Sequence, residues 1–335
     1  MFTRRYSVIS DMKVINIREI ECFKIGHAQN IEGGTGCTAI ICENGAFAGV
    51  DVRGGGPATR ETDLLKPINM VQQIHCVMLS GGSAYGLAAG DGAMSFLEEK
   101  NIGFDVGVGV VPIVSEASLF DLVVGDSKCR PDKKMGYEAC RNAFEYKDEF
   151  LEQGNVGAGT GATVGKYLGI DNLMKSGIGH YAVEIGEIKC GAIVAVNALG
   201  DILDYETGNI IAGLLNEDKT SFMDTKKAMY EEISRPRNVF SGNTTIGCII
   251  TNAKLDKVQC NKIAQVAHNG YAKVISPVHT SADGDSIFVM ASGEKEVNSD
   301  AFGTLCTEVM ARAINQAVMA AKPAYNLKAA IEFSK

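Results

Sequence analysis

The sequence predicts an α/β fold of the layered α+β type, a sandwich of sheet and helix layers built from one domain. Three observations favour this class. Short β-rich runs bounded by glycine recur, and several are apolar at every position, as in strands buried on both faces. Helical patterns lie between them, but strands and helices come in runs and lack the strict alternation of a doubly wound sheet. No linker separates regions of different composition, so residues 1–335 are expected to form a single domain.

The expected strands are apolar stretches rich in β-branched residues that end at glycine or at a polar turn. In chain order they are Cys37–Cys42, Ala46–Val52, Val106–Val114, Ala192–Asn197, Thr245–Thr251 and Ser286–Ala291.

The expected helices carry apolar residues at helical spacing. The first begins at Ser83, a residue type that often caps helices, and runs to about Lys100. The second runs from about Lys254 to Lys273, and the third from about Ser299 to Ala321.

Composition and charge exclude several classes of protein. The net charge is −8, from 32 basic and 40 acidic residues, and no basic stripe of the kind that binds nucleic acid is present. No apolar run approaches the roughly 20 residues that span a bilayer, and no apolar stretch follows Arg4 and Arg5. We therefore expect a cytoplasmic protein with no membrane and no nucleic-acid partner. The 10 cysteines contain no C-x-x-C pair, which favours reduced core thiols and no metal site.

The glycine content is high, 38 of 335 residues or about 11 percent, and the glycines cluster between apolar runs. The stretch Gly157–Lys166 approaches two nucleotide-binding motifs and matches neither. A phosphate loop would need glycine at position 160 and Ser or Thr after the lysine, where Thr160 and Tyr167 stand. The dinucleotide fingerprint would need glycine at position 164, which is Val164. No cofactor is expected, and the clusters indicate tight turns and close approach of the backbone.

A small polar cluster, Ser241–Thr245, leads directly into an apolar strand. In structural terms it is a turn that enters a strand. In chemical terms, the hydroxyl of Thr244 could attack the carbonyl of Asn243. After cleavage the new α-amine, with a pKa of about 7.7 to 8.0, could serve as the base for that hydroxyl.

The sequence resembles the DmpA-like family, and the resemblance rests on six ordered blocks over roughly 250 residues. This family includes L-aminopeptidase/D-esterases, β-peptidyl aminopeptidases and nylon-oligomer hydrolases. Its members are N-terminal-nucleophile hydrolases. The resemblance implies the αββα-type sandwich that this family shares with ornithine acetyltransferases. The blocks are Gly33–Cys37, Val52–Asp63, Ser80–Leu87, Gly154–Lys166, Asn243–Thr245, and Pro277–Thr280 followed by Asp283–Asp285.

The resemblance implies a role for two residues at the junction. Thr244 stands where the family places its nucleophile, and Asn243 would be the last residue before an autocatalytic cut. The chain would then consist of a larger subunit, residues 1–243, and a smaller one, residues 244–335.

The resemblance also implies the residues around the nucleophile. Lys166 matches the lysine of the branch of nylon-oligomer hydrolases, and Asp283 and Asp285 match the acidic pair of the same branch. Asn197 matches the asparagine expected to donate to the oxyanion. Backbone N–H groups of a glycine-rich segment such as Gly81-Gly82 would complete the oxyanion hole.

In this interpretation Lys166 lowers the pKa of the Thr244 amine by like-charge repulsion and stabilises developing negative charge. Asp283 and Asp285 orient the amine and balance the lysine. One departure stands out, because the family's tyrosine in the stretch 112–121 is replaced by Phe120, which removes a phenolic donor.

Other charged and titratable residues are interpreted structurally. His279 stands near Asp283, and a metal site or a Ser-His-Asp arrangement is conceivable there. No metal or nucleophile-elbow motif supports either, so a hydrogen-bonded structural histidine is favoured. Arg53, Arg60 and the acidic residues Glu61 and Asp63 are expected to form buried or half-buried pairs around the Gly54–Pro57 loop.

Three functions follow as hypotheses. The first is an autoprocessing hydrolase of small amides, peptides or esters with a free amino end. The second is an acyl transferase related to ornithine acetyltransferase, although the Ser-Gly-Asn-Thr junction differs from that group's Lys-Gly-Ala-Thr type. The third is an uncut, catalytically silent assembly protein. The resemblance implies a homo-oligomer, a tetramer of processed pairs, and the sequence does not specify the substrate.

Overall fold

The computed structural model describes residues 12–146, 149–234 and 242–333. Residues 1–11, where no signal segment is expected, and Ser241 of the junction lie outside these ranges. The helices are α1 Ala89–Glu99, α2 Lys133–Glu145, α3 Thr225–Glu231, α4 Lys257–Val274 and α5 Ser299–Met319. The strands are β1 Lys13–Val14, β2 Lys24–Asn30, β3 Thr35–Val52, β4 Thr59–Arg60, β5 Gln73–Ser80, β6 Phe104–Asp105, β7 Val110–Val111, β8 Val114–Ser118, β9 Thr163–Val164, β10 Met174–Lys175, β11 Ile178–Ile185, β12 Ile188–Ala195, β13 Asp201–Leu203, β14 Ile210–Ala212, β15 Ile246–Ala253, β16 Ile275–Ser276 and β17 Ser286–Lys295.

The main strands join in the order β1-β11-β12-β15-β17-β3-β5-β8-β4, with β2 also paired to β3. The long strand β3 connects two halves of this arrangement. Its first part, Thr35–Ile41, pairs with β2, and its second part, Phe47–Val52, pairs with β17. The pairing of β3 with β5 shifts register between Ile41 and Ala46, where Gly45 has a φ of +77°. This irregularity lets one chain segment pass from one layer of strands to the next.

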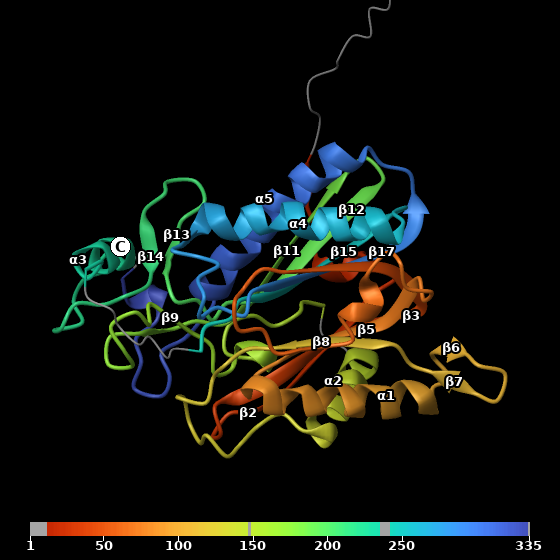
Figure 1. Ribbon diagram of the computed structural model, residues 1–335, viewed down its shortest axis with the longest axis horizontal. Coiled ribbons are helices and arrows are strands. Elements are labelled where there is room, and N and C mark those ends of the chain that lie inside the picture. Colours follow the sequence, from red (N-terminus) through yellow and green to blue (C-terminus); the bar gives the residue numbers. More distant parts are fainter. Residues whose placement is uncertain (1–11, 147–148, 235–241, 334–335) are drawn as a thin grey trace, which may run out of the picture.

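Three apolar cores separate four layers. The first lies between helices α4 and α5 and one face of β11, β12, β15 and β17. The second lies between the opposite faces of these strands and those of β2, β3 and β5. The third lies between β2, β3, β5 and β8 and helices α1 and α2. Helices therefore cover both outer faces of two stacked strand layers (Figure 1), which confirms the αββα-type sandwich.

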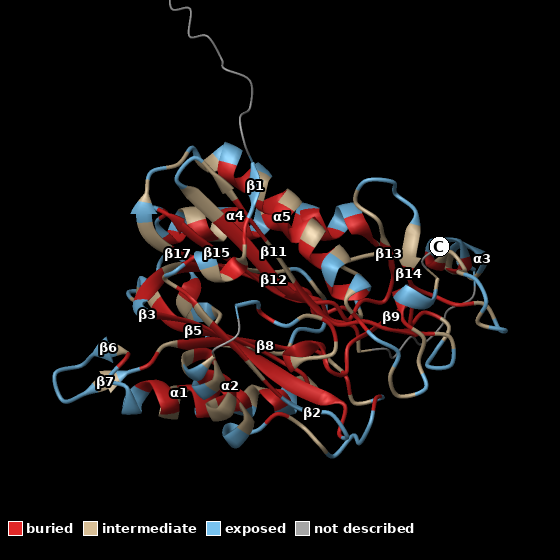
Figure 2. Ribbon diagram, turned by 180° about the vertical axis from the view of Figure 1, so that it is seen from behind, coloured by how far each residue is buried: buried red, intermediate tan, exposed pale blue. Residues whose placement is uncertain are grey.

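Alternation along β17 shows why its stretch Ile287–Ala291 is apolar at every position. Phe288 and Met290 belong to the core between the strand layers, while Val289 and Ala291 belong to the core under α4 and α5. Figure 2 shows the same burial along β12, β15 and β17. Continuous apolar runs here indicate strands buried on both faces, as the sequence predicted.

Five of the six predicted strands lie in observed strands within a few residues, but two of them, Cys37–Cys42 and Ala46–Val52, are parts of the single strand β3. The prediction of a strand over Val106–Val114 is wrong. Phe104–Asp105 and Val110–Val111 form a small hairpin, and Gly107 and Gly109, both with positive φ, lie in its turn. Glycine at these positions favours a turn over an extended strand.

All three predicted helices are present; α5 begins at the predicted Ser299, whereas α1 and α4 begin later than predicted. Ser83 does not cap the first, because it has a φ of +55° and lies in a 3-10 turn, Ser83–Ala88, that precedes α1. Helices α4 and α5 are capped by Asp256 and Asn298, each of which accepts backbone N–H groups of the first turn. The sequence analysis did not identify helix α2, which Asp132 caps in the same way.

Candidate functional site

Thr244 lies two residues before the central strand β15, between the segment that follows β12 and the segment that leads into β17. Its side chain is buried, and its Oγ1 donates a hydrogen bond to the carbonyl oxygen of Asn243. Its backbone N–H donates to the carbonyl oxygen of Asn197 at 2.9 Å. In the uncut chain, the hydroxyl and the preceding carbonyl are therefore direct neighbours.

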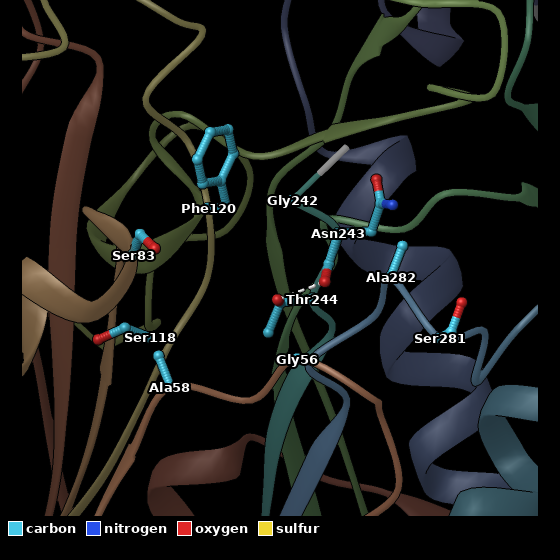
Figure 3. Close-up of a pocket in the computed structure, with 10 residues that line it drawn as sticks. All are labelled: Gly56, Ala58, Ser83, Ser118, Phe120, Gly242, Asn243, Thr244, Ser281 and Ala282. Atoms are coloured by element: carbon cyan, nitrogen blue, oxygen red, sulfur yellow. Dashed lines mark hydrogen bonds between the residues drawn. The ribbon is translucent and has the colours of Figure 1, made fainter. Parts of the chain in front are cut away.

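A cavity of about 350 Å³ opens beside this hydroxyl. Figure 3 shows Thr244 and Asn243 on one side of it, with Phe120 and Ser83 across from them. The lining residues come from segments far apart in the sequence, and they are Gly56, Ala58, Ser83, Ser118, Phe120, Gly242, Asn243, Thr244, Ser281 and Ala282. The cavity has the size and position of a substrate site.

Lys166 follows strand β9 and is buried next to this junction. Its Nζ donates to Oδ1 of Asn197 at 2.5 Å, to the carbonyl oxygen of Asn197 at 3.2 Å and to that of Gly242 at 3.3 Å. Three acceptors match the three N–H bonds of an ammonium group. Burial lowers the pKa of Lys166 to about 7, while the charge of Asp283 acts in the opposite direction.

Asn197 is fully buried and joins Lys166 to the cavity wall. Its Oδ1 accepts from Lys166 and from the backbone N–H of Thr163 at 3.1 Å, and its Nδ2 donates to the carbonyl oxygen of Phe120 at 2.9 Å. Its carbonyl oxygen holds the N–H of Thr244, the group that would become the α-amine after a cut. The sequence analysis had assigned that orienting role to the two aspartates.

Asp283 and Asp285 flank the junction but bind its neighbours. Asp285 accepts from the N–H of Thr245 at 2.8 Å and pairs with Nδ1 of His279 at 2.8 Å. Asp283 accepts from the N–H of Thr280 at 2.6 Å. Burial, followed by the charge of Asp285, raises the pKa of Asp283 to about 6. His279 thus has the hydrogen-bonded role that the sequence favoured.

Gly284, between these two aspartates, makes a contact that the sequence analysis missed. Its N–H donates to the carbonyl oxygen of Asn243 at 2.8 Å, as part of a parallel bridge between Asn243 and Asp283. A Cβ at position 284 would lie 2.7 Å from Oγ1 of Thr244. The Asp-Gly-Asp pattern could have indicated this contact from the sequence, because a glycine between two buried acids lets another backbone segment approach closely.

The structure does not favour Gly81 and Gly82 as oxyanion donors. The N–H of Gly81 donates to the carbonyl oxygen of Gly36 at 2.9 Å, and that of Gly82 donates to Asp121 at 2.7 Å. A Cβ on Gly81 would lie 2.0 Å from a carboxylate oxygen of Asp121. The glycines here permit the close approach of Asp121, a buried acid that also accepts from Thr35 at 2.7 Å.

The Gly54–Pro57 loop packs against the backbone of residues 281–285. A Cβ on Gly54 would lie 2.2 Å from the carbonyl oxygen of Asp283, and the N–H of Gly56 donates to the same oxygen at 2.8 Å. The loop thus supports the segment that carries Gly284, as the glycine clusters indicated.

The charge pairs around this loop differ from the expected ones in their partners and in the exposure of Asp63. Arg53 pairs with Asp51 at 2.7 Å and Arg60 with Asp91 at 2.6 Å. Asp63 is instead a surface residue that pairs with Lys66, with 86% of its side chain exposed.

In the described part of the chain, no group of three or more His, Cys, Asp or Glu side chains is placed to hold a metal ion. Among the same residues, no helix is long and apolar enough to cross a membrane.

The model of the family described as peptidase family S58 matches residues 16–330. A protein of Mycobacterium leprae named as an uncharacterized aminopeptidase is 36% identical over 337 residues, covering 92% of this chain and 91% of its own length. A 6-aminohexanoate-oligomer endohydrolase of Kocuria sp. is 31% identical over 310 residues, covering 88% of this chain and 83% of its own length.

Solved structures show the same fold at lower identity. The L-aminopeptidase D-Ala-esterase/amidase of Ochrobactrum anthropi, described as a variant of the Ntn-hydrolase fold, matches with a TM-score of 0.66 and 17% identity, over 91% of this chain and 86% of that one. A β-aminopeptidase of Burkholderia sp. matches with a TM-score of 0.65 and 19% identity, over 93% and 89% of the two chains.

Proposed function

The chain belongs to peptidase family S58 and is a hydrolase of that family, and from this premise we propose that it cuts itself between Asn243 and Thr244 and then uses Thr244 to cleave small amides, peptides or esters. The family resemblance expected from the six sequence blocks is confirmed. One observation carries the proposal. The Thr244 hydroxyl and the Gly284 N–H both hydrogen-bond to the carbonyl oxygen of Asn243, at the edge of a cavity.

The proposed self-cleavage begins when Oγ1 of Thr244 attacks the carbonyl carbon of Asn243. The C–N bond to Thr244 breaks, its nitrogen gains the hydroxyl proton, and an ester replaces the amide. Water then hydrolyses this ester to release the Asn243 carboxylate and restore the hydroxyl. The Gly284 N–H stabilises the negative charge that develops on the carbonyl oxygen, because it already donates to that atom at 2.8 Å.

In substrate hydrolysis the free amine of Thr244 takes the proton from its own hydroxyl as Oγ1 attacks an amide or ester carbonyl. The proton passes to the leaving group, and water cleaves the acyl-enzyme ester. We assign Gly284, together with the side-chain amide of Asn197, to the oxyanion hole. Loss of one such donor typically costs about 10² to 10³ in rate.

Charges near the junction support this chemistry. The Lys166 ammonium lies one hydrogen bond from the carbonyl oxygen of Asn197, which also holds the nitrogen of Thr244. A cation there lowers the pKa of a nearby α-amine and favours its free-base form. Asp283 and Asp285 balance the lysine, because a buried cation without nearby negative charge would lose its proton.

The test is the covalent state of the purified chain. Intact mass and a denaturing gel should show fragments of 243 and 92 residues. Thr244→Ala should remain full length and inactive, because it lacks the attacking oxygen. The matched control Thr244→Ser keeps a hydroxyl and should still be cut. A Thr244→Ala chain that is cut, or that hydrolyses amides, would assign the nucleophile to another residue.

A further inference from the structure

We infer that Lys175 is a positioning residue of this site: its buried ammonium group fixes the turn that leads to Thr163 and Lys166, and its positive charge acts on the Lys166 ammonium. This inference rests on the proposed self-cleavage, because it concerns the residues that surround Thr244. The sequence analysis assigned no role to Lys175.

The first observation is what the Lys175 side chain binds. Lys175 is the last residue of β10 and is fully buried. Its Nζ donates to the carbonyl oxygens of Gly159 and Ala162, each at 3.0 Å, and to that of Ser176. Three acceptors match the three N–H bonds of an ammonium group. One buried cation therefore binds both ends of the Gly159–Ala162 turn that precedes β9.

The second observation is that this turn leads directly to the groups beside the nucleophile. Strands β9 and β10 form a ladder in which Lys175 is paired with Thr163. The N–H of Thr163 donates to Oδ1 of Asn197 at 3.1 Å, and the same oxygen accepts from Nζ of Lys166 at 2.5 Å. A shift of the turn would therefore move both donors that orient the Asn197 side chain.

The third observation is a carboxylate on the same turn. A Cβ on Gly161 would lie 2.7 Å from Cβ of Asp121 and 3.0 Å from its Oδ2, so Asp121 packs against this glycine. Burial lowers the pKa of Lys175 and of Lys166 to about 7, and the charge of Asp121 acts in the opposite direction on each. Asp121 is thus a counter-charge that the two buried lysines share.

Lys175 also acts on Lys166 through charge. Burial is the main cause of the low pKa of Lys166, and the charge of Lys175 lowers it further, against the charges of Asp283 and Asp121. Like charges disfavour each other's protonated form. Lys175 therefore takes part in setting the pH above which Lys166 loses its proton.

Another buried lysine makes similar contacts away from the cavity. Lys257 is 2% exposed, and its Nζ donates to the carbonyl oxygens of Leu64, Asn69 and Val71 at 2.7, 3.0 and 2.7 Å. Residues 64–71 are not among the described residues that line the cavity. Because the two lysines bind the same kind and number of acceptors, Lys257 is a matched control for Lys175.

The test measures self-cleavage of uncut chains from cell-free translation between pH 5 and pH 9. Lys175→Met removes the charge and the three donors from a side chain of similar length. At its pH of maximum rate, it should be cut about 10- to 100-fold more slowly than the parent, because a misplacement of about 1 Å can cost about 10²-fold. On the alkaline side its rate should fall at a higher pH than in the parent, because Lys166 is no longer repelled.

Lys257→Met removes the same groups from the control lysine, and its rate should fall at the same alkaline pH as in the parent. Circular dichroism of chains that also carry Thr244→Ala shows whether each variant folds. If Lys175→Met does not fold, Lys175→Gln, which keeps two N–H donors but no charge, is measured in its place. Equal pH profiles for the variants at positions 175 and 257 would overturn the inference.

Asp121→Asn tests the charges with both lysines in place. Its side-chain oxygen can still accept from the N–H of Gly82, which donates to Asp121 at 2.7 Å. The alkaline fall should move to lower pH, opposite to its movement in Lys175→Met, because the counter-charge of both lysines is lost. Movement in the same direction in both variants would contradict the charge argument.

The outcomes separate this inference from the proposed function. If the parent chain is never cut, the proposed function fails and this inference fails with it. If the parent is cut but Lys175→Met behaves as Lys257→Met does, the proposed function stands and only the inference is wrong.

Discussion

Lys166 is a buried cation whose direct partners are neutral oxygen atoms. Its Nζ contacts two oxygens of Asn197 and one of Gly242, while its balancing carboxylate, Asp283, acts at longer range. Burial lowers the pKa of the lysine to about 7 and raises that of the aspartate to about 6. Both groups therefore change charge close to neutral pH, which makes the site sensitive to pH.

The rate of self-cleavage should accordingly show a maximum between about pH 6 and pH 7. Below about 6, Asp283 gains a proton and no longer balances the lysine. Above about 7, Lys166 loses its proton and no longer stabilises the oxyanion. The uncut chain from cell-free translation, incubated at pH 5 to 8.5, gives the rate from the appearance of fragments on a denaturing gel.

Asp283→Asn provides the control for this profile, because it keeps an oxygen for Thr280 but cannot titrate. Its rate should no longer fall on the acid side, and the fall on the alkaline side should begin at a lower pH, because the charge of Asp283 raises the pKa of Lys166. If the rate of this variant still fell on the acid side as in the parent chain, a group other than Asp283 would cause that fall.

At the scale of elements, the site depends on two backbone segments that lie unusually close to each other. The loop at Gly54–Gly56 supports residues 281–285, and these in turn hold the carbonyl of Asn243. Side chains larger than hydrogen at Gly54 or Gly55 would separate the segments and move Gly284 from its acceptor. The glycine cluster thus contributes, through packing, to the geometry that the proposed self-cleavage requires.

Gly54→Ala should destabilise the fold by about 1–3 kcal/mol, the usual cost of overpacking, and should slow self-cleavage. Its Cβ would meet the carbonyl oxygen of Asp283 at 2.2 Å. Stability is best compared in chains that also carry Thr244→Ala, so that every chain is uncut, with unfolding followed by circular dichroism.

Gly56→Ala is the matched control, because its Cβ would have no neighbour nearer than 3.9 Å. It should unfold within about 0.5 kcal/mol of its parent, as most substitutions outside tight packing do. Equal destabilisation by both substitutions would refute the proposed close packing.

At the scale of the whole molecule, the predicted cut would not separate two domains. The smaller piece, residues 244–335, contains the central strands β15 and β17 and both helices of one outer layer. Strand β15 pairs with β12, and β17 pairs with β3, so each belongs to a ladder with the larger piece. The two pieces would share their cores.

We therefore predict that the cut fragments co-elute under native conditions and separate only in denaturant. Thermal unfolding should show one cooperative transition, because neither fragment retains a complete core. Elution of a free 92-residue fragment from a native column would contradict this. The same column tests the tetramer of processed pairs, which would elute at four times the 35.6 kDa of one chain.

The sequence by itself determined the layers, the family and the residues at the centre of the candidate site. Continuous apolar runs predicted doubly buried strands, helical spacing predicted α4 and α5, and motif order placed Thr244, Lys166 and Asn197 in one site. These patterns are local or depend on the order of motifs along the chain, so they can be recognised from the sequence alone. Local patterns failed at Val106–Val114, where the glycines in the run form a turn.

Only the tertiary structure decided which groups meet. It brought the N–H of Gly284 to the carbonyl of Asn243, committed the amides of Gly81 and Gly82 to other acceptors, and pressed Phe120 against Gly242. Each contact joins residues that are distant in sequence, and its geometry is set by how the two strand layers and their loops pack. Residue type and spacing carry no information about such distances. For that reason the hydrogen bond from Gly284 to Asn243, on which the proposed oxyanion hole rests, and the close contact beside Gly242 could be identified only from the folded chain.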